Sequence, residues 1–401
     1  MRVLAVGNMY PPQSFGGYEL LWRGAVEHLR AAGHEVRVLT TDYSSGAPER
    51  DDPDVHRELR WYWRDHEFPK LAPHRLVGLE RGNAAVLARH LAELRPDVVS
   101  WWSMGGMSLS LLEQVRRAGR PAVAFLQDHW LEYGPHVDHW LRSFGGRKRV
   151  LAGPAERLTG IPAHVDLAHA ARYMCGSELI RAKARAAVPG LADTGIARSG
   201  IQARFLDAAP PRPWEWRLLY VGRVDERKGI DTAVEALVHL PEAATLTIVG
   251  SWDERAEAGL AQRADALGVR ARVEFAGQRS PAELPGAYAG ADAVLFPVRW
   301  EEPWGLVPLE AMGIGRPVVA TGRGGSGEYL RDGENCLLFG VGDAAALAGA
   351  VTRLAESPEL RERVRAGGLE TAPRYTEERF NATVEAELER AVAGDREARD
   401  A

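Results

Sequence analysis

The chain has 401 residues, which is too long for one ordinary hydrophobic core and suits two domains. An apolar fraction of 45% and a charged fraction of 26% are ordinary for a globular protein, and a net charge of -5 argues against nucleic acid as a partner. The two cysteines, Cys175 and Cys336, lie far apart, so neither a disulfide framework nor a zinc motif is expected. No apolar run is long enough for a signal peptide or a transmembrane segment, so we expect a cytoplasmic protein, peripheral at the inner membrane face if it docks on a lipid surface.

In the first half of the chain, short apolar runs alternate with amphipathic stretches, the pattern of βαβ units around a parallel sheet. The strands predicted there cover residues 3–6, 35–40, 97–101, 122–126 and 172–175. The helices predicted between them cover residues 18–31, 82–94, 108–117 and 177–187. Residues 42–80 show no clear period. A long irregular insertion of this kind is usually functional or disordered, and its aromatic residues argue against plain disorder.

A proline-rich connector near residues 207–216 separates this half from a second series of the same kind. Its predicted strands cover residues 217–221, 245–249, 272–275, 293–297 and 317–320. Its predicted helices cover residues 229–239, 254–267, 281–289, 305–312, 344–356 and 359–367. We therefore expect an α/β protein with two Rossmann-like domains, residues 1–207 and 208–375, facing each other across a cleft. An amphipathic helix and a charged, frayed tail at 376–401 are expected to pack back on the first domain.

Ligands of open α/β sheets bind at the carboxyl ends of the strands, so the loops that follow the strands are the informative ones. The first such loop carries Gly16 and Gly17 directly before a predicted helix. Glycine lets the backbone approach a ligand closely, and a helix N-terminus favours an anion. A glycine turn without a ligand is an equal alternative. The G-x-G-x-x-G spacing of dinucleotide-binding proteins is absent, which argues against a nicotinamide-dependent dehydrogenase.

The second loop, "VGRVDERKGID", places Gly222 and Arg223 at a strand end and Lys228 and Gly229 at a helix start. Arginine offers a planar fork and lysine a point charge, so the two cations are suited to clamp a diphosphate from two sides. Two solvated surface charges are the alternative. The glycine beside each cation favours the phosphate site.

The third loop, "RWEEPWGLVPLEAM", is the most specific stretch. The strand before it ends in a loop that carries Glu301 and Glu302, and Pro303 is predicted in the first turn of a helix that carries Glu310 further along. Carboxylates accept hydrogen bonds from pairs of sugar hydroxyls, as in ribose recognition. Free N–H groups at the helix start are further candidates for binding phosphate, at Gly305, Leu306 and Val307. Two glutamates on a solvated helix face are the alternative, but "GLVPLEAM" is too apolar for it.

These motifs together resemble the retaining, nucleotide-sugar-dependent glycosyltransferases of family 4, which have the GT-B fold. The G-R-x-x-x-x-K-G element matches residues 222–229, and the two glutamates separated by seven residues match Glu302 and Glu310 in their E-P-W-G-L context. "TGRGGSGEYLRDGENCLLF" is similar to the family's glycine-rich loop, with Gly324, Gly325 and Glu328. The resemblance covers nearly the whole chain and is strongest at 218–337.

The resemblance implies a role for each matching position. Arg223 and Lys228 would hold the donor diphosphate, Glu310 the ribose hydroxyls and Glu302 the donor sugar, while Gly17 would approach the distal phosphate. The sugar would move from a nucleoside diphosphate sugar to the hydroxyl of a small-molecule or lipid-linked acceptor with retention of anomeric configuration. Neither a metal nor a cofactor would be required, since cations and helix N-termini neutralise the leaving diphosphate.

The sequence departs from the family pattern in the first half. Gln127 and Asp128 stand where the family commonly has His-Asp, and His129 comes two positions late. Glutamine can bond a sugar hydroxyl but does not titrate near neutral pH, so imidazole chemistry is disfavoured here. The acceptor-side candidates are His129, Trp61 and Trp63. The two tryptophans are suited to stack on a sugar face, with plain core or interface roles as the commoner alternative.

Two alternatives stay open. A sugar-nucleotide epimerase or hydrolase of the same fold would also bind a diphosphate, but it would yield an isomer or free sugar rather than a glycosylated acceptor. A catalytically silent subunit would bind nucleotide or carbohydrate only. The intact Arg223, Lys228, Glu302 and Glu310 argue against the silent subunit, whereas Gln127 argues for it.

Overall fold

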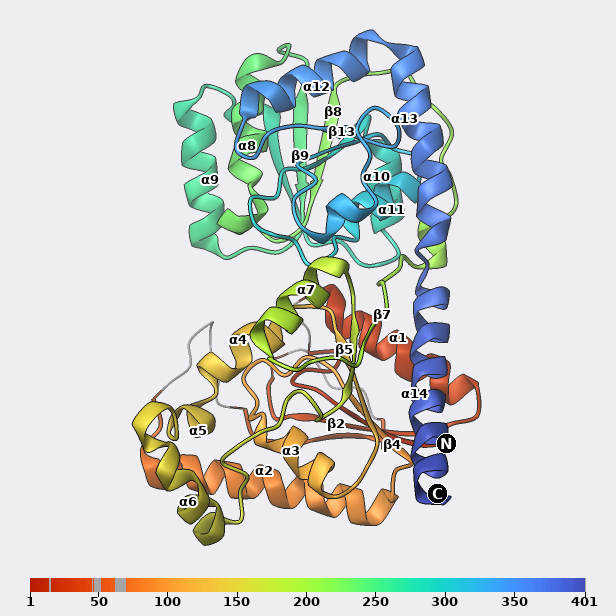
Figure 1. Cartoon of the computed structure of the whole chain (residues 1–401). Coiled ribbons are helices and arrows are strands. Elements are labelled where there is room, and N and C mark those ends of the chain that lie inside the picture. Colours follow the sequence, from red (N-terminus) through yellow and green to blue (C-terminus); the bar gives the residue numbers. More distant parts are fainter. Residues whose placement is uncertain (14–15, 45, 47–51, 62–69, 401) are drawn as a thin grey trace. The chain divides into compact units, whose positions relative to one another are not determined.

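The structure, a computed structural model, describes residues 1–13, 16–44, 46, 52–61 and 70–400 (Figure 1). The chain forms two compact units. Unit 1 comprises Met1–Arg198 and the stretch from Phe380 onward, and unit 2 comprises Ser199–Arg379. The division lies before the predicted boundary at 207, because the segment that starts at Ser199 packs on unit 2. The Nε1 of Trp304 donates to the carbonyl of Ser199 at 2.9 Å, and Phe205 lies in the same apolar cluster as Met312.

Unit 1 is built on a seven-stranded parallel sheet. Its strands, in spatial order, are β3 (Val55–Leu59), β2 (Glu35–Thr41), β1 (Arg2–Val6), β4 (Val98–Trp101), β5 (Ala122–Leu126), β6 (Arg172–Cys175) and β7 (Thr194–Ile196). The order reverses at β1, which pairs Val6 with Leu39 on one side and with Trp101 on the other. This is the switch point at which open α/β sheets bind ligands. The expectation that 42–80 is wholly irregular is wrong, because β3 and the first turns of the next helix lie there.

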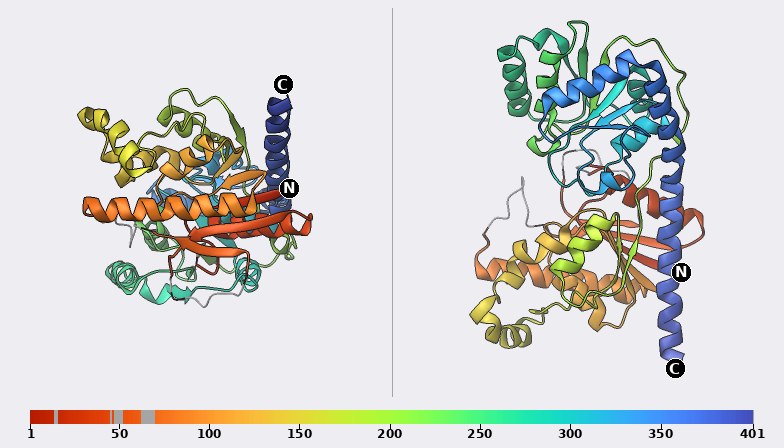
Figure 2. Two further views of the ribbon diagram at one scale, coloured as in Figure 1. Left: turned by 90° about the horizontal axis from the view of Figure 1, so that it is seen from below. Right: turned by 45° about the horizontal axis from the view of Figure 1, so that its top comes forward.

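Helices cover this sheet, and Figure 2 shows α2 running along one face. The unit contains α1 (Gly17–Ala31), α2 (Pro73–Leu94), α3 (Ser110–Arg117), α4 (Trp130–Val137), α5 (His139–Arg142), α6 (Ala152–Thr159), α7 (Glu178–Ala187) and most of α14 (Glu377–Asp400). On α14, Phe380, Val384 and Leu388 are buried, and Arg172 of β6 pairs with Glu387 at 2.7 Å. The charged C-terminal residues, expected to fray, continue this helix through Asp400.

Unit 2 repeats the architecture with six parallel strands. They are β10 (Val273–Gly277), β9 (Thr245–Val249), β8 (Arg217–Val221), β11 (Ala293–Phe296), β12 (Val318–Ala320) and β13 (Leu337–Leu338). The helices are α8 (Ile230–Ala236), α9 (Glu254–Ala266), α10 (Leu284–Gly290), α11 (Val307–Gly313), α12 (Ala344–Glu356) and α13 (Pro358–Thr371). Alternate side chains of β8 enter two cores on opposite faces, Leu218 and Tyr220 in one and Leu219 in the other. The predicted fold class, two α/β units with parallel sheets, is confirmed.

One element of unit 2 differs from its prediction in a way that concerns the site. α11 begins at Val307, and Pro308 rather than Pro303 lies in its first turn. Gly305, between them, has a φ of +86°, which breaks the helical path. Glu302 therefore lies on the loop before α11, and only Glu310 is on the helix. Within the part of the chain that the structure describes, no helix combines the length and apolar character needed to cross a bilayer.

Candidate functional site

The loop after β8 carries the two predicted cations. Gly222 and Gly250 bring the ends of β8 and β9 together so closely that a Cβ at Gly250 would lie 1.9 Å from the carbonyl oxygen of Gly222. Tyr220 donates its hydroxyl to the carbonyl of Arg223 at 2.7 Å and so fixes the backbone there. The guanidinium of Arg223 forms no hydrogen bond or ion pair with any residue that the structure describes, which leaves its five N–H donors for a ligand.

Lys228 ends a short 3₁₀ turn, Glu226–Lys228, which Asp225 caps with its carboxylate. The hydrogen bond from Arg227 lowers the pKa of Asp225 to about 2, so the cap stays ionised at neutral pH. Gly229 follows with a φ of +67°, and a Cβ there would lie 2.0 Å from the carbonyl oxygen of Pro297. Only glycine fits this contact between the loop and the end of β11, which explains the Lys-Gly pair physically.

Glu302 is the partner of Lys228. The Lys228 ammonium lies 2.7 Å from Oε2 of Glu302, and Nε1 of Trp300 donates to the same oxygen at 2.6 Å. The ammonium also lies 5.4 Å from the centroid of the Trp300 ring. The Glu302 carboxylate is largely buried, and these donors replace the hydrogen bonds that it would otherwise form with water. Three polar groups from loops at neighbouring strand ends thus form one network.

The glycine-rich loop after β12 supports this network from its backbone side. Gly324 forms a β-bridge with Glu302, and the Gly325 amide donates to the Glu302 carbonyl at 2.7 Å. Gly324 has a φ of +83°, and a Cβ there would lie 2.4 Å from the Glu302 nitrogen. A side chain at 324 would displace Glu302, so the two motifs, distant in sequence, depend on one another.

Glu310 lies apart from this network, on α11. It accepts a hydrogen bond of 2.5 Å from the hydroxyl of Tyr288, a fully buried residue of α10. Burial raises the pKa of Glu310 to about 6, and the Tyr288 hydrogen bond opposes that shift. Near neutral pH the group is therefore a carboxylate with one oxygen engaged, suited to accept further hydroxyl donors. The backbone ahead of α11 is fixed by Tyr329, whose hydroxyl donates to the Gly305 carbonyl at 2.5 Å, with Leu306 as the N-cap before Val307.

The sequence analysis missed three aromatic residues of this site, Trp300, Tyr288 and Tyr329. Trp300 stands two positions before Glu302, and an indole beside a buried carboxylate was a usable signal. Tyr288 and Tyr329 have no such signal, because their partners Glu310 and Gly305 lie on other elements.

In unit 1, Gly16 and Gly17 lie at the N-terminus of α1, and both are exposed. The Gly16 amide donates to the Glu19 carboxylate at 2.9 Å, so one of the free donors at this helix start is already used. Tyr18 donates its hydroxyl to the carbonyl of Phe125 at the end of β5. This bond ties the start of α1 to the end of β5, directly before the loop that carries Gln127 and Asp128.

That loop holds the residues that depart from the family pattern. Nε2 of Gln127 donates to the Ala197 carbonyl at 3.1 Å, and a Cβ at Gly176 would lie 2.3 Å from Oε1 of Gln127. Asp128 accepts from the Trp130 amide and the Tyr133 hydroxyl, both at 3.1 Å, and burial raises its pKa to about 6. Both side chains are thus oriented by the protein itself.

His129 is the N-cap of α4 through its backbone. Trp61 bonds the Asp42 carboxylate through its amide at 3.0 Å, and its ring makes an edge contact of 4.6 Å with Tyr43. Trp63 lies outside the described residues. Trp61 is therefore part of a small aromatic pair.

Two groups of potential metal ligands occur among the described residues. In the first, His56, Glu58 and His90, Nη1 of Arg37 lies 3.3 Å from Nδ1 of His90, and Nε2 of His90 lies 3.5 Å from Glu58 without a hydrogen bond. In the other, Nε2 of His34 lies 2.9 Å from Glu385. A nitrogen that carries a hydrogen offers no lone pair to a metal.

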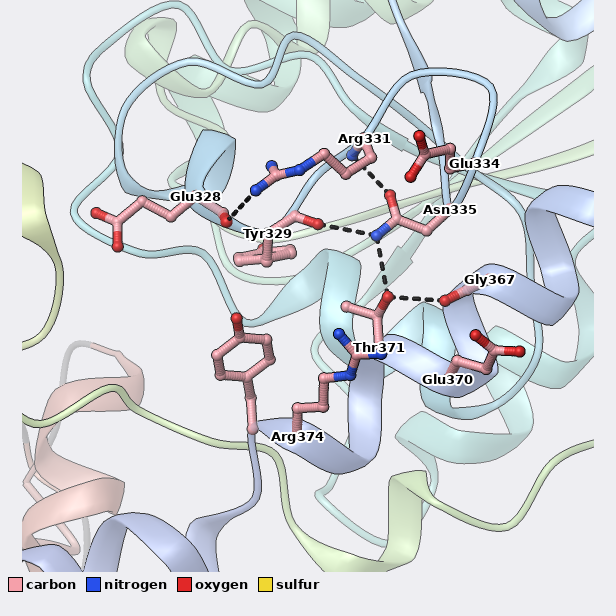
Figure 3. Close-up of a pocket in the computed structure, with 10 residues that line it drawn as sticks. Glu328, Tyr329, Arg331, Glu334, Asn335, Gly367, Glu370, Thr371 and Arg374 are labelled. Atoms are coloured by element: carbon pink, nitrogen blue, oxygen red, sulfur yellow. Dashed lines mark hydrogen bonds between the residues drawn. The ribbon is translucent and has the colours of Figure 1, made fainter.

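Unit 2 also has a polar pocket of about 310 Å³, shown in Figure 3. Its buried Asn335 is satisfied from three sides, by the Arg331 amide at 2.7 Å, the Tyr329 carbonyl at 2.8 Å and the Thr371 hydroxyl at 3.0 Å. Arg331 in turn donates to the carbonyl of Glu328. None of the residues predicted to bind the donor or the acceptor lines this pocket, although Tyr329, whose hydroxyl bonds the Gly305 carbonyl, does.

Comparison with known proteins assigns the chain. Residues 207–370 match the family model of glycosyl transferases group 1, and residues 16–189 match that of the glycosyl transferase 4-like domain. The chain belongs to the family 4 glycosyltransferases. It is 29% identical over 387 residues to the glycogen synthase of Mycobacterium tuberculosis, covering 90% of this chain and 88% of that one. It is 37% identical over 185 residues to a phosphatidyl-myo-inositol mannosyltransferase of Mycobacterium leprae, covering 44% and 48%.

Solved structures agree on the fold of this glycosyltransferase. Sucrose-phosphate synthase from Thermosynechococcus elongatus superposes with a TM-score of 0.72 at 20% identity, covering 98% of this chain and 99% of that one. Anabaena HepE in complex with UDP and glucose superposes with a TM-score of 0.71 at 20% identity, covering 97% and 99%. The fold is therefore GT-B, as the motifs predicted.

Proposed function

We propose that this glycosyltransferase moves a sugar from a nucleoside diphosphate sugar to an acceptor hydroxyl, with retention of anomeric configuration and without a metal ion. The observation that carries the proposal is the network of Lys228, Glu302 and Trp300 at the carboxyl ends of β8 and β11, with Arg223 beside it on the same loop. Anabaena HepE, which has the same fold, holds UDP and glucose, and this supports the donor class.

The two cations are proposed to hold the diphosphate. Arg223 forms no ion pair within the described part of the chain, and Lys228 is held by one carboxylate oxygen. Negative charge on the diphosphate grows as the glycosidic bond breaks, so fixed cations stabilise the transition state more than the bound donor. Such cations replace the divalent metal that other enzymes place on a leaving diphosphate.

Glu310 is proposed to accept hydrogen bonds from the ribose. Tyr288 engages Oε2, which leaves Oε1 for a hydroxyl donor. Gly305, Leu306 and Val307 are proposed to offer backbone donors to the nucleotide phosphates, and Gly222 allows close approach beside Arg223. Glu302 is proposed to bind a hydroxyl of the donor sugar.

The residues of unit 1 are proposed to serve the acceptor and the reacting sugar and, through Gly16 and Gly17, the distal phosphate of the donor. Gln127, Asp128 and the glycines 16 and 17 follow the ends of β5 and β1, where loops carry ligands in this type of sheet. In the proposed step the bond between the anomeric carbon and the diphosphate oxygen breaks. The acceptor oxygen bonds the same face of that carbon, and its proton passes to the departing phosphate oxygen. His129 and Trp61 remain acceptor-side candidates.

One experiment tests stereochemistry and metal together. Transfer is followed by proton NMR with and without excess EDTA, and the anomeric coupling of the product is measured. We expect the donor's anomeric configuration in the product and no loss of activity with the chelator. An inverted product would exclude the retaining mechanism. Activity lost with EDTA and restored by Mg²⁺ would exclude the two-cation account.

The donor is best found by thermal unfolding with a panel of nucleoside diphosphate sugars, because a ligand that binds only the native state raises the midpoint. A donor that stabilises the protein and yields glycosylated product separates transfer from epimerisation or hydrolysis. Stabilisation without turnover on any acceptor would favour the silent subunit, the alternative that Gln127 suggests.

A further inference from the structure

The long connection between β5 and β6 exposes a group of apolar side chains on unit 1. Val150 and Leu151 end the 3₁₀ turn Gly146–Leu151, and Leu158 lies on the following helix α6. Their exposed fractions are 79%, 54% and 81%. The other exposed large apolar side chains of the described residues, Val238, Leu267 and Val341, are exposed by 49%, 37% and 44% and are scattered over unit 2. The exposure of Val150, Leu151 and Leu158 close together is unusual, since burial of each apolar side chain would be favourable.

The segment does not need these side chains for its own packing. A small separate core beneath it contains Leu76, Trp140, Ile161 and Ala163, and Figure 1 shows α5 and α6 beside one end of α2. Nε1 of Trp140 donates to the Pro162 carbonyl at 2.7 Å, which ties the connection to itself. The exposed side chains therefore lie on the outer side of a packed substructure.

The same surface is strongly basic. Residues 139–160 include five cations, at 142, 147, 148, 149 and 157, and a single carboxylate, Glu156, in a chain whose net charge is -5. Glu156 is engaged by Arg117 and by the Ala163 amide at 3.1 Å, so it does not neutralise the run. Arg147, Lys148 and Arg149 form no ion pair with the described residues. We call these three cations, together with Val150, Leu151 and Leu158, the basic apolar patch.

The chemistry of this patch selects its occupant. A stable protein partner needs an interface of about 800 Å² a side, far more than three apolar side chains supply. A second copy of this chain, docked by two-fold symmetry, would place the cations of one patch against those of the other. An anionic lipid surface satisfies both halves of the patch, because it accepts a few apolar side chains at the acyl boundary and attracts cations to its headgroups.

We propose that the basic apolar patch docks this chain on an anionic lipid membrane. Val150, Leu151 and Leu158 insert at the headgroup–acyl boundary. Arg147, Lys148 and Arg149 contact the lipid phosphates. The cations attract the protein to the membrane surface, and the apolar side chains hold it there, so both parts of the patch are required. The docking does not depend on the identity of the donor or the acceptor.

The test is co-sedimentation of the full chain with large unilamellar vesicles. We expect binding to vesicles of phosphatidylcholine with phosphatidylglycerol, little binding to phosphatidylcholine alone, and loss of binding as NaCl rises, since salt screens the headgroup charge. The charge variant R147S/K148S/R149S should weaken binding at least about tenfold, because each cation near such a surface contributes about fivefold. The apolar variant V150S/L151S/L158S should weaken binding to at least the same degree, because binding strength depends on the apolar area that enters the membrane.

Matched controls remove the same side-chain types from unit 2. R204S/R255S/R353S removes three exposed arginines, and V238S/L267S/V341S removes three exposed apolar side chains. Both should bind vesicles as the parent does. Circular dichroism and size-exclusion chromatography with light scattering verify folding and oligomeric state for every variant.

Three outcomes would overturn the proposal. Absent binding to anionic vesicles at low salt would do so directly. Equal loss in the unit 2 controls would show general electrostatic adsorption. A parent dimer that the apolar variant converts to monomer, without vesicle binding, would assign the patch to self-association. None of these readouts uses turnover, so they are independent of the proposed transferase function.

Discussion

The two units share a sheet type but differ in how their candidate site residues are held. In unit 2, side chains from different loops hold one another, as Lys228 and Trp300 hold Glu302. In unit 1, Gln127 bonds the backbone carbonyl of Ala197, and Asp128 bonds the Trp130 amide and the Tyr133 hydroxyl, so backbone groups share in holding both. A site whose charged groups constrain each other demands fixed residue types at fixed spacing. A site held by backbone allows exchange, which is consistent with glutamine replacing the family's histidine.

If this contrast is correct, the largest effects should come from the cations of unit 2. Lys228→Ala and Arg223→Ala should each lower kcat by about 10²–10³-fold and raise the donor KM less, because leaving-group charge grows in the transition state. Steady-state kinetics at saturating acceptor measure the split.

Arg263→Ala is the matched control, because Arg263 of the same unit also pairs with a carboxylate, that of Glu235, on an exposed surface. It should leave both constants near the parent's. A change in donor KM alone for the two site variants would reduce the clamp to a binding device.

A smaller effect is expected at the ribose side. Glu310→Ala should weaken nucleoside diphosphate binding by about 1–3 kcal/mol, the range for lost hydrogen bonds to a charged group. Tyr288→Phe keeps the ring and removes only the hydroxyl that orients Glu310, so its loss should be smaller. Isothermal titration calorimetry on folded variants measures both. Unchanged affinity in Glu310→Ala would remove Glu310 from the ribose site.

The titration of Glu310 predicts a pH dependence. Its pKa is raised from 4.5 to about 6, and ribose hydroxyls donate more strongly to the ionised form than to the protonated one. Donor affinity should therefore fall as the pH drops below about 6, by up to about tenfold per unit. The free energy of unfolding depends on pH in the opposite direction. The stability that protonated Glu310 contributes is fully present below pH 4.5 and is lost as the pH rises through about 6. Calorimetry from pH 5 to 8 with an intact nucleotide sugar should give this slope, and Glu310→Gln should abolish it.

The strands of both units and the donor motifs of unit 2 were predictable from the sequence. Alternating apolar runs located ten of the strands, because central strands of parallel sheets are continuously apolar. β3 was missed because it is an edge strand whose sequence, "VHREL", is mostly polar. The donor motifs were recognisable because positions 229 and 324 accept only glycine, since a Cβ at either position would collide with backbone atoms.

Other features could not be predicted, because they arise from contacts between elements distant in sequence. Pro303 has the appearance of a first-turn proline, yet the turn at Gly305 moves the helix start to Val307. The partnership of Tyr288 with Glu310 joins two helices and has no local signature. The helices between 130 and 159 were missed as well: α5 and α6 pack on a small core of their own rather than on the sheet, whereas α4 contributes Trp130 and Leu131 to the main core of unit 1.

The smallest effect is expected at Gln127. Gln127→His should keep at least about a tenth of the activity, since the bond it removes to the Ala197 carbonyl is a neutral hydrogen bond. Gly176→Ala is the sharper companion, because its methyl group would lie 2.3 Å from Oε1 of Gln127 and would displace the side chain. If Gln127 contacts the reacting sugar, Gly176→Ala should lower kcat/KM more than it lowers the melting temperature. If Gln127 only ties its loop to Ala197, both variants should lose stability and keep kcat. A folded Gln127→His protein without detectable transfer would contradict the backbone-held description of unit 1, and the alignment of "LQDHW" with the family's His-Asp would then have to be shifted.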